Sequence, residues 1–251
     1  MSSKRLIALV CEGPGDAEII KAIVDKLTGY ENIYRQLQPE RTLADSQGKY
    51  GGGWKGVWKW CEDNRNDLDL LMAGISAGYD CLIIQMDGDV SRKEKEVHCK
   101  CKSTVCEKNH YTHPLRCEIA LHKKCPVAMP CPDHIKLCGY AEHLTGLIST
   151  WLDLKTKSST VIITIPCDST DTWIAVAFGD LNANCEEHID PWDTIVGRAN
   201  PYHNIRVPHQ RKTIKIFTEF GNKVAENWEA VKFHCPQANA FEIALCSKLR
   251  L

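Results

Sequence analysis

The sequence predicts an α/β protein in which a mostly parallel sheet is flanked by helices. Three short apolar runs, at residues 6–11, 81–86 and 161–165, lack polar alternation and are therefore typical of strands buried on both faces. Stretches with helical periodicity separate and follow these runs. Strands that alternate with helices favour a parallel sheet with helices on both faces.

The first run stops at a turn rich in Gly and Pro, residues 12–16, and a helix with an apolar face follows it. Asp16 is placed to cap the start of that helix, with a contact to a metal site as the alternative. Further along, we expect a strand at residues 33–37 and a helical stretch at 54–77 that is broken near 64–67.

The second half of the chain continues the alternation. We expect a helix at residues 139–154, a turn at 166–173, and a helix that starts near Asp171. Residues 182–208 have no clear period and are expected to be irregular. Two helices, at residues 219–232 and 241–249, are expected to close the chain.

Composition excludes some classes of protein. The 251 residues are 43% hydrophobic and 25% charged, which is ordinary for a globular protein, and the formal net charge of -1 provides no global attraction for nucleic acid. There is no apolar run long enough to span a membrane, and the first residues lack the layout of a signal peptide. We therefore expect a cytoplasmic protein without a membrane partner.

Carboxylates follow two of the expected strands. Glu12 comes directly after the first run, and Asp87 and Asp89 follow the second. Because the carboxyl ends of parallel strands meet at one edge of a sheet, these three side chains are expected to share a Mg²⁺ or Mn²⁺ ion. If the strand continues, Asp87 and Asp89 point the same way, and Gly88 leaves room for a phosphate. Acidic residues also cap helices after strands, and an isolated Asp-x-Asp is common.

The combination of Glu-Gly-x-x-Asp after one strand and Asp-x-Asp after a later one resembles the Toprim domain, over roughly residues 5–90. Members include topoisomerases, bacterial primases and nucleases of the overcoming-lysogenization-defect type. The resemblance implies that Glu12, Asp87 and Asp89 are catalytic metal ligands. The chain looks most like small stand-alone Toprim proteins of bacterial defence systems, in which Asp171, before Trp173, would be a further ligand. A nearby lysine is also implied, with Lys93, Lys95 and Lys102 as alternatives.

Residues 91–138 form an apparent insertion between two parts of a catalytic domain, 1–90 and 139–251. Seven of the 14 cysteines and five of the 10 histidines fall between residues 98 and 138, and this clustering favours structural zinc over incidental buried cysteines. A stretch with so few large aliphatic residues needs such an organiser. The candidate ligands are Cys99, Cys101, Cys106, His110, Cys125, Cys131, His134 and Cys138.

Basic residues in and beyond the insertion could bind a nucleic-acid backbone, or could simply keep a loop solvated. The candidates are Lys100, Lys102, Lys123 and Lys124, with Arg211 and Lys212 near the end of the chain.

The leading hypothesis is a metal-dependent nuclease that hydrolyses DNA or RNA phosphodiesters. The resemblance further implies the effector of a bacterial antiphage defence system, with an ATPase or another regulatory protein as partner. The chain is too short for the modules that accompany topoisomerases and primases. The alternatives are a non-catalytic, zinc-stabilised adaptor that binds nucleic acid or protein, and a structural subunit whose acidic cluster is only a feature of the fold.

Overall fold

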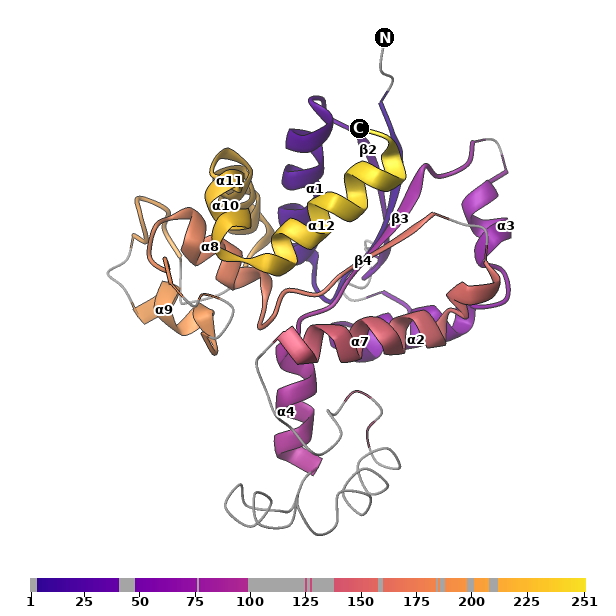
Figure 1. The fold of residues 1–251 in the computed structure, drawn as a ribbon, viewed down its shortest axis with the longest axis horizontal. Coiled ribbons are helices and arrows are strands. Elements are labelled where there is room, and N and C mark those ends of the chain that lie inside the picture. Colours follow the sequence, from indigo (N-terminus) through magenta and orange to yellow (C-terminus); the bar gives the residue numbers. More distant parts are fainter. Residues whose placement is uncertain are drawn as a thin grey trace.

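The fold is an α/β arrangement around a four-stranded, all-parallel sheet (Figure 1). The computed structural model describes residues 4–251, except 41–47, 76, 99–124, 126, 128–137, 158–159, 184, 186–187, 198–200 and 208–211. In the order β2-β1-β3-β4, the strands are β2 (Ile33–Gln38), β1 (Leu6–Val10), β3 (Cys81–Gln85) and β4 (Val161–Thr164). Strands β1, β3 and β4 lie at the three apolar runs, and β2 lies where the strand at residues 33–37 was expected.

The helices alternate with the strands, as expected. Their bounds are α1 (Pro14–Thr28), α2 (Gly53–Asn64), α3 (Leu68–Ala73), α4 (Asp89–His98), α7 (Cys138–Trp151), α8 (Thr170–Ala177), α9 (Pro191–Gly197), α10 (Ile214–Glu226), α11 (Trp228–His234) and α12 (Pro236–Leu249), with a short 3-10 helix at Leu154–Thr156. The break between α2 and α3 was predicted. Among the described residues, no helix combines the length and apolar character needed to cross a bilayer.

Three expectations about the helices are wrong. The stretch 182–208 contains α9, and the single helix expected at 219–232 is two helices that meet at Asn227. Helix α1 begins at Pro14, with Gly13 as its N-cap, so Asp16 lies in the first turn and is not the N-cap residue. In addition, helix α4 begins at Asp89 and continues to His98, so residues 91–98 of the expected insertion are helical.

Each face of the sheet has its own core. Along β1, Ile7 and Leu9 belong to the core with α1, α8, α10, α11 and α12, whereas Ala8 and Val10 belong to the core with α2, α3 and α7. The period of two in a strand produces this division. In Figure 1, α2 and α7 lie side by side across the sheet from α1 and α12. Helices on both faces explain why β1 and β3 are almost continuously apolar.

The strand order determines which edge of the sheet carries the predicted acidic residues. After β1 the chain adds β2 on one side, and then returns to add β3 on the other side of β1. The carboxyl ends of β1 and β3 are therefore a topological switch point, where α/β sheets usually bind their ligands. Glu12 follows β1 at this point, and Asp87 follows β3.

Candidate metal centre

A buried glutamine connects the two predicted acidic segments. The backbone N–H of Glu12 donates to Gln85 Oε1 at 3.2 Å, and Gln85 Nε2 donates to Asp87 Oδ1 at 2.7 Å. Glu12 is half-buried, and its Oε1 is a buried atom without a hydrogen-bond partner among the described residues. A buried carboxylate oxygen that accepts nothing is costly, and a bound cation would satisfy it.

The loop after β3 is tied to the loop after β4 by main-chain hydrogen bonds. The N–H of Gly88 donates to Pro166 O at 3.0 Å, and that of Asp89 donates to Asp168 O at 2.9 Å. A Cβ on Gly88 would lie 2.2 Å from Cys167 O. Gly88 therefore makes room for neighbouring backbone, and the expectation that it leaves space for a phosphate is wrong. Strand β3 ends at Gln85, so the condition under which Asp87 and Asp89 would point the same way, a strand that continues through both, is not met.

Asp16 and Asp171 bring two further carboxylates to the same edge. Thr170 Oγ1 donates to Asp16 Oδ1 at 2.6 Å, which connects the start of α8 to the start of α1. Asp171 is 2% exposed as a side chain, and Lys212 Nζ donates to its Oδ2 at 2.5 Å. The other oxygen, Asp171 Oδ1, is buried and has no hydrogen-bond partner in the described part of the chain. Lys212 thus contacts the acidic site itself.

A second group of carboxylates surrounds Asp89. One ligand atom from each of Asp89, Asp168 and Asp190 lies within 4.8 Å of the others, a spacing that could hold a metal ion. Asp168 is 1% exposed and Asp190 is 41% exposed, so the group runs from the core to the surface. The backbone N–H of Asp190 donates to Asp168 Oδ2 at 3.2 Å and holds the two together.

Two consecutive cations on α4 neutralise part of this second group. Arg92 Nη2 lies 3.0 Å from Asp168 Oδ1 and 3.4 Å from Asp190 Oδ1. Lys93 Nζ lies 2.5 Å from Asp89 Oδ2 and 3.1 Å from Asp190 Oδ1. The carboxylates are therefore held in place by charges of the chain itself, and Lys93, at 51% exposure, remains reachable from solvent.

Electrostatics show that the carboxylates outweigh these cations at the buried side of the site. Burial, and then repulsion from Asp16 and Asp89, raises the pKa of Glu12 well above its ordinary value. The pKa of Asp87 is also raised well above its ordinary value, first by burial and then by repulsion from Asp16, Glu12 and Asp89. Burial raises the pKa of Asp16 to about 6, against the hydrogen bond from Thr170. These mutual effects mean that the carboxylates lie close enough to repel one another.

The same causes act at the edges of the cluster. Burial, and then repulsion from Asp89, raises the pKa of Asp168 to about 6, although Arg92 lowers it. Burial also raises the pKa of Asp171, against the pull of Lys212. Burial alone would lower the pKa of Lys93. The ion pairs of Lys93 with Asp89 and Asp190 outweigh burial, so the pKa of Lys93 is raised. Perturbed carboxylates of this kind concentrate at functional sites.

The structure thus brings Glu12, Asp87, Asp89 and Asp171 to one edge of the sheet. Of the predicted trio, only Asp89 belongs to the described group whose ligand atoms all lie within 4.8 Å. The sequence reasoning did not single out Asp168 or Asp190 as ligands. Asp168 lies four residues after the end of β4, in the loop that follows the strand, and could have been found by the rule applied to Glu12 and Asp87. For Asp190 there was no such signal, because it lies between α8 and α9 at the end of an irregular segment.

Most of the zinc and nucleic-acid candidates lie outside the described residues. This holds for Cys99, Cys101, Cys106, His110, Cys131, His134, Lys100, Lys102, Lys123, Lys124 and Arg211, and for the side chain of Cys138. Cys125 is described. It is 2% exposed in the core beside α7, and its Sγ lies 3.4 Å from Glu94 Oε2. The zinc-binding insertion remains a prediction.

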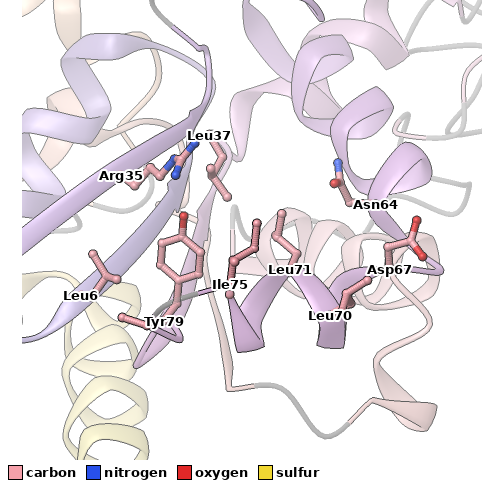
Figure 2. A pocket seen from close by; sticks show the side chains of 11 residues that line it. Leu6, Arg35, Leu37, Asn64, Asp67, Leu70, Leu71, Ile75 and Tyr79 are labelled. Carbon is pink, nitrogen blue, oxygen red and sulfur yellow. The ribbon is translucent and has the colours of Figure 1, made fainter.

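A separate pocket of about 730 Å³ lies away from the carboxylates (Figure 2). Its lining residues include Leu6 at the start of β1 and Tyr79 just before β3, so it is near the amino ends of the strands. Figure 2 shows Leu71 of α3 and Arg35 of β2 on opposite sides of it. None of the acidic residues described above lines this pocket, which therefore belongs to a different part of the molecule.

In comparisons with known proteins, no family model, no curated protein and no solved structure matched the chain.

Proposed function

We propose that the chain is a metal-dependent nuclease that hydrolyses DNA or RNA phosphodiester bonds at this carboxyl edge. One observation carries the proposal: carboxylates from separate chain segments converge at a topological switch point, where burial, and then repulsion among them, raises the pKa of Glu12 and Asp87. Such an arrangement destabilises a protein unless a cation binds it. The unpartnered Glu12 Oε1 supports the same conclusion.

The donor set fits a hard divalent cation. Carboxylate oxygens are the ligands of Mg²⁺ and Mn²⁺, and sulfur and imidazole donors are absent from the group formed by Asp89, Asp168 and Asp190. Glu12, Asp87 and Asp89 would hold the ion at the buried side, and Asp168 and Asp190 would extend the site outward from Asp89. A bound ion of this kind polarises a phosphoryl oxygen and lowers the pKa of its water.

The residues around the carboxylates have separable roles in this proposal. Gln85 holds the Asp87 carboxylate toward Glu12, and Thr170 fixes Asp16. Lys93 is half exposed next to Asp89, so its ammonium can meet a substrate phosphate while Arg92 keeps Asp168 in place. Lys212 orients the buried Asp171. Phosphoryl chemistry depends mainly on such positioning and on charge.

Two finer parts of the proposal rest on the resemblance to the Toprim domain: a Toprim-like classification of the α/β fold, and a role as the effector of a bacterial defence system with a regulatory partner such as an ATPase. The zinc-binding insertion rests on the clustering of cysteine and histidine between residues 98 and 138, and the cytoplasmic location rests on the sequence composition. The parallel order of the sheet and the positions of Glu12, Asp87 and Asp89 after β1 and β3 support the classification.

The test is cleavage of plasmid DNA, single-stranded DNA and tRNA by purified protein, with and without Mn²⁺ or Mg²⁺. We expect cleavage only with the divalent ion, and its loss in Glu12→Gln and in the double variant Asp87→Asn, Asp89→Asn. Asp193→Asn, an exposed change on α9, is the matched control and should remain active. Undiminished cleavage in the site variants would refute the proposal, and binding without divalent-dependent cleavage would favour the adaptor.

A further inference from the structure

Helix α2 has a strip of alternating aromatic and basic side chains, Trp54, Lys55, Trp58 and Lys59, which we call the α2 strip. Its two indoles are half-buried and its two lysines are exposed. The ring centroids of Trp54 and Trp58 are 6.0 Å apart with an interplanar angle of 30°, and Lys55 Nζ lies 5.5 Å from the Trp54 ring. Neither lysine has an ion pair in the described part of the chain, so both charges are available to a partner.

Part of each indole packs against the core beneath α2, which accounts for its buried portion. Packing alone does not explain why the remaining portions are exposed next to unpaired lysines. The ring centroid of Trp58 also lies 6.5 Å from that of the buried Trp151 of α7, which holds the inner part of the Trp58 indole in place. The combination of exposed ring surface and free positive charge is the one that binds bases and phosphates together.

The α2 strip begins at the acidic site. The N–H of Gly53, the first residue of α2, donates to the carbonyl oxygen of Glu12 at 2.9 Å. Trp54 Nε1 donates to Glu94 Oε1 at 2.8 Å, and Glu94 lies on α4, one residue after Lys93. A chain lying along α2 would therefore lead directly to the carboxylates.

The backbone between the strip and Glu12 is open. Gly51 and Gly53 have φ values of 77° and 72°, and nothing lies within 4 Å of where a Cβ would stand on either. Helix α2 has no side-chain N-cap and no acidic residue in its first turn. The N–H of Gly53 already donates to Glu12 O, but the N–H groups of the next residues and the helix dipole add a favourable location for a phosphate beside the α2 strip.

We propose that the substrate of this site is single-stranded nucleic acid, which reaches the carboxylates along the α2 strip. Bases stack on Trp54 and Trp58, and phosphates contact Lys55 and Lys59. In a duplex the base faces are covered by neighbouring bases, so only an unpaired strand can use the indoles. The inference rests on the proposed nuclease function and narrows its substrate class.

The experiment measures binding of labelled oligonucleotides of about 20 nucleotides by fluorescence anisotropy. It uses the full chain with Asp87→Asn and Asp89→Asn and without divalent ions, so that cleavage does not interfere. Oligo(dT) and oligo(U) are compared with a duplex of equal length. We expect the single strands to bind at least about 10-fold more tightly than the duplex, because only they can stack on the indoles.

Substitutions then identify the surface. Trp54→Ala and Trp58→Ala should each weaken single-strand binding by about 10-fold, while Trp54→Phe retains most of it. Phe233→Ala, which removes an aromatic ring that is 83% exposed on α11, is the matched control and should change nothing.

The double variant Lys55→Glu, Lys59→Glu tests the charges without disturbing the core. Loss of two phosphate contacts should reduce the slope of log affinity against log salt by about 1.4. Lys248→Glu on α12, also exposed, is its control.

Equal binding of duplex and single strand, or single-strand binding that survives both the tryptophan and the lysine changes, would overturn the inference. Failure of the single-strand inference can be distinguished from failure of the proposed nuclease function. Divalent-dependent cleavage of duplex alone by the unmodified protein keeps the nuclease and eliminates the single-strand path. Strip-dependent binding of single strands without any cleavage removes the nuclease and keeps the binding surface.

Discussion

Removing the charge of Asp16 should stabilise the protein in the absence of divalent ions. The folded state raises the pKa of this carboxyl from 3.8 to about 6, chiefly through burial. The folded protein therefore holds the proton more tightly than the unfolded chain, and stability falls as the pH rises between these values. Above pH 6 the cost reaches about 3 kcal/mol. Asp16→Asn removes this cost and keeps an oxygen that can accept the hydrogen bond from Thr170.

Urea unfolding, followed by tryptophan fluorescence in buffer depleted of divalent ions, measures the effect. At about pH 8 the free energy of unfolding of Asp16→Asn should exceed that of the unmodified protein by up to about 3 kcal/mol, and at about pH 4.5 by only about 1 kcal/mol. Added Mn²⁺ should reduce the difference in free energy of unfolding between the two proteins, because the ion stabilises the unmodified protein, which keeps the Asp16 charge, more than it stabilises Asp16→Asn. Asp193→Asn should show no such gain. A variant no more stable than its parent at pH 8 would refute the electrostatic reasoning.

Three further predictions concern the supports of the site. Gly88→Ala should lower the free energy of unfolding by more than about 2 kcal/mol, because the added Cβ would meet Cys167 O. The same change should weaken Mn²⁺ binding in calorimetry. The control Gly146→Ala, on α7 with open space around it, should leave the free energy of unfolding unchanged or raise it. Lys212→Met should lower the free energy of unfolding by about 2 kcal/mol in the same assay, because the buried Asp171 carboxylate loses its ion pair. An unchanged unfolding midpoint would contradict a stabilising role of Lys212. Elemental analysis of dialysed protein should find at least one equivalent of zinc, and a zinc-free, fully stable protein would end the prediction about the insertion.

The sheet could be predicted from the sequence because its signals are local. The continuous apolar runs at 6–11 and 81–86 are long enough to be strands and too short to be buried helices, and the structure has β1 and β3 there. Their carboxyl ends were then fixed by the rule for parallel sheets, which placed Glu12 and Asp87 at one edge. Both inferences needed only the pattern within each segment.

The rest of the site depends on contacts between distant segments, which leave little local trace. Asp16 has the spacing of a cap, yet Thr170, 154 positions away, occupies its carboxylate. Asp190 reaches Asp168 from a segment without periodicity, with its backbone at φ 51°, a conformation that Asp tolerates better than most residues. Gly88 suggested space for a ligand because the approach of Pro166 and Cys167 could not be seen from the sequence.

The adjacent cations Arg92 and Lys93 on α4 affect how tightly the carboxylates could bind a divalent ion. Arg92 and Lys93 already serve as internal counterions for Asp89, Asp168 and Asp190. In the proposed metal site, an incoming divalent ion would compete with these cations and would have to displace Lys93 from Asp89. Occupancy would then require a higher free-ion concentration than bare carboxylates need. Each bound ion would release an ammonium group beside the carboxylates, which would couple ion binding to the binding of a polyanion.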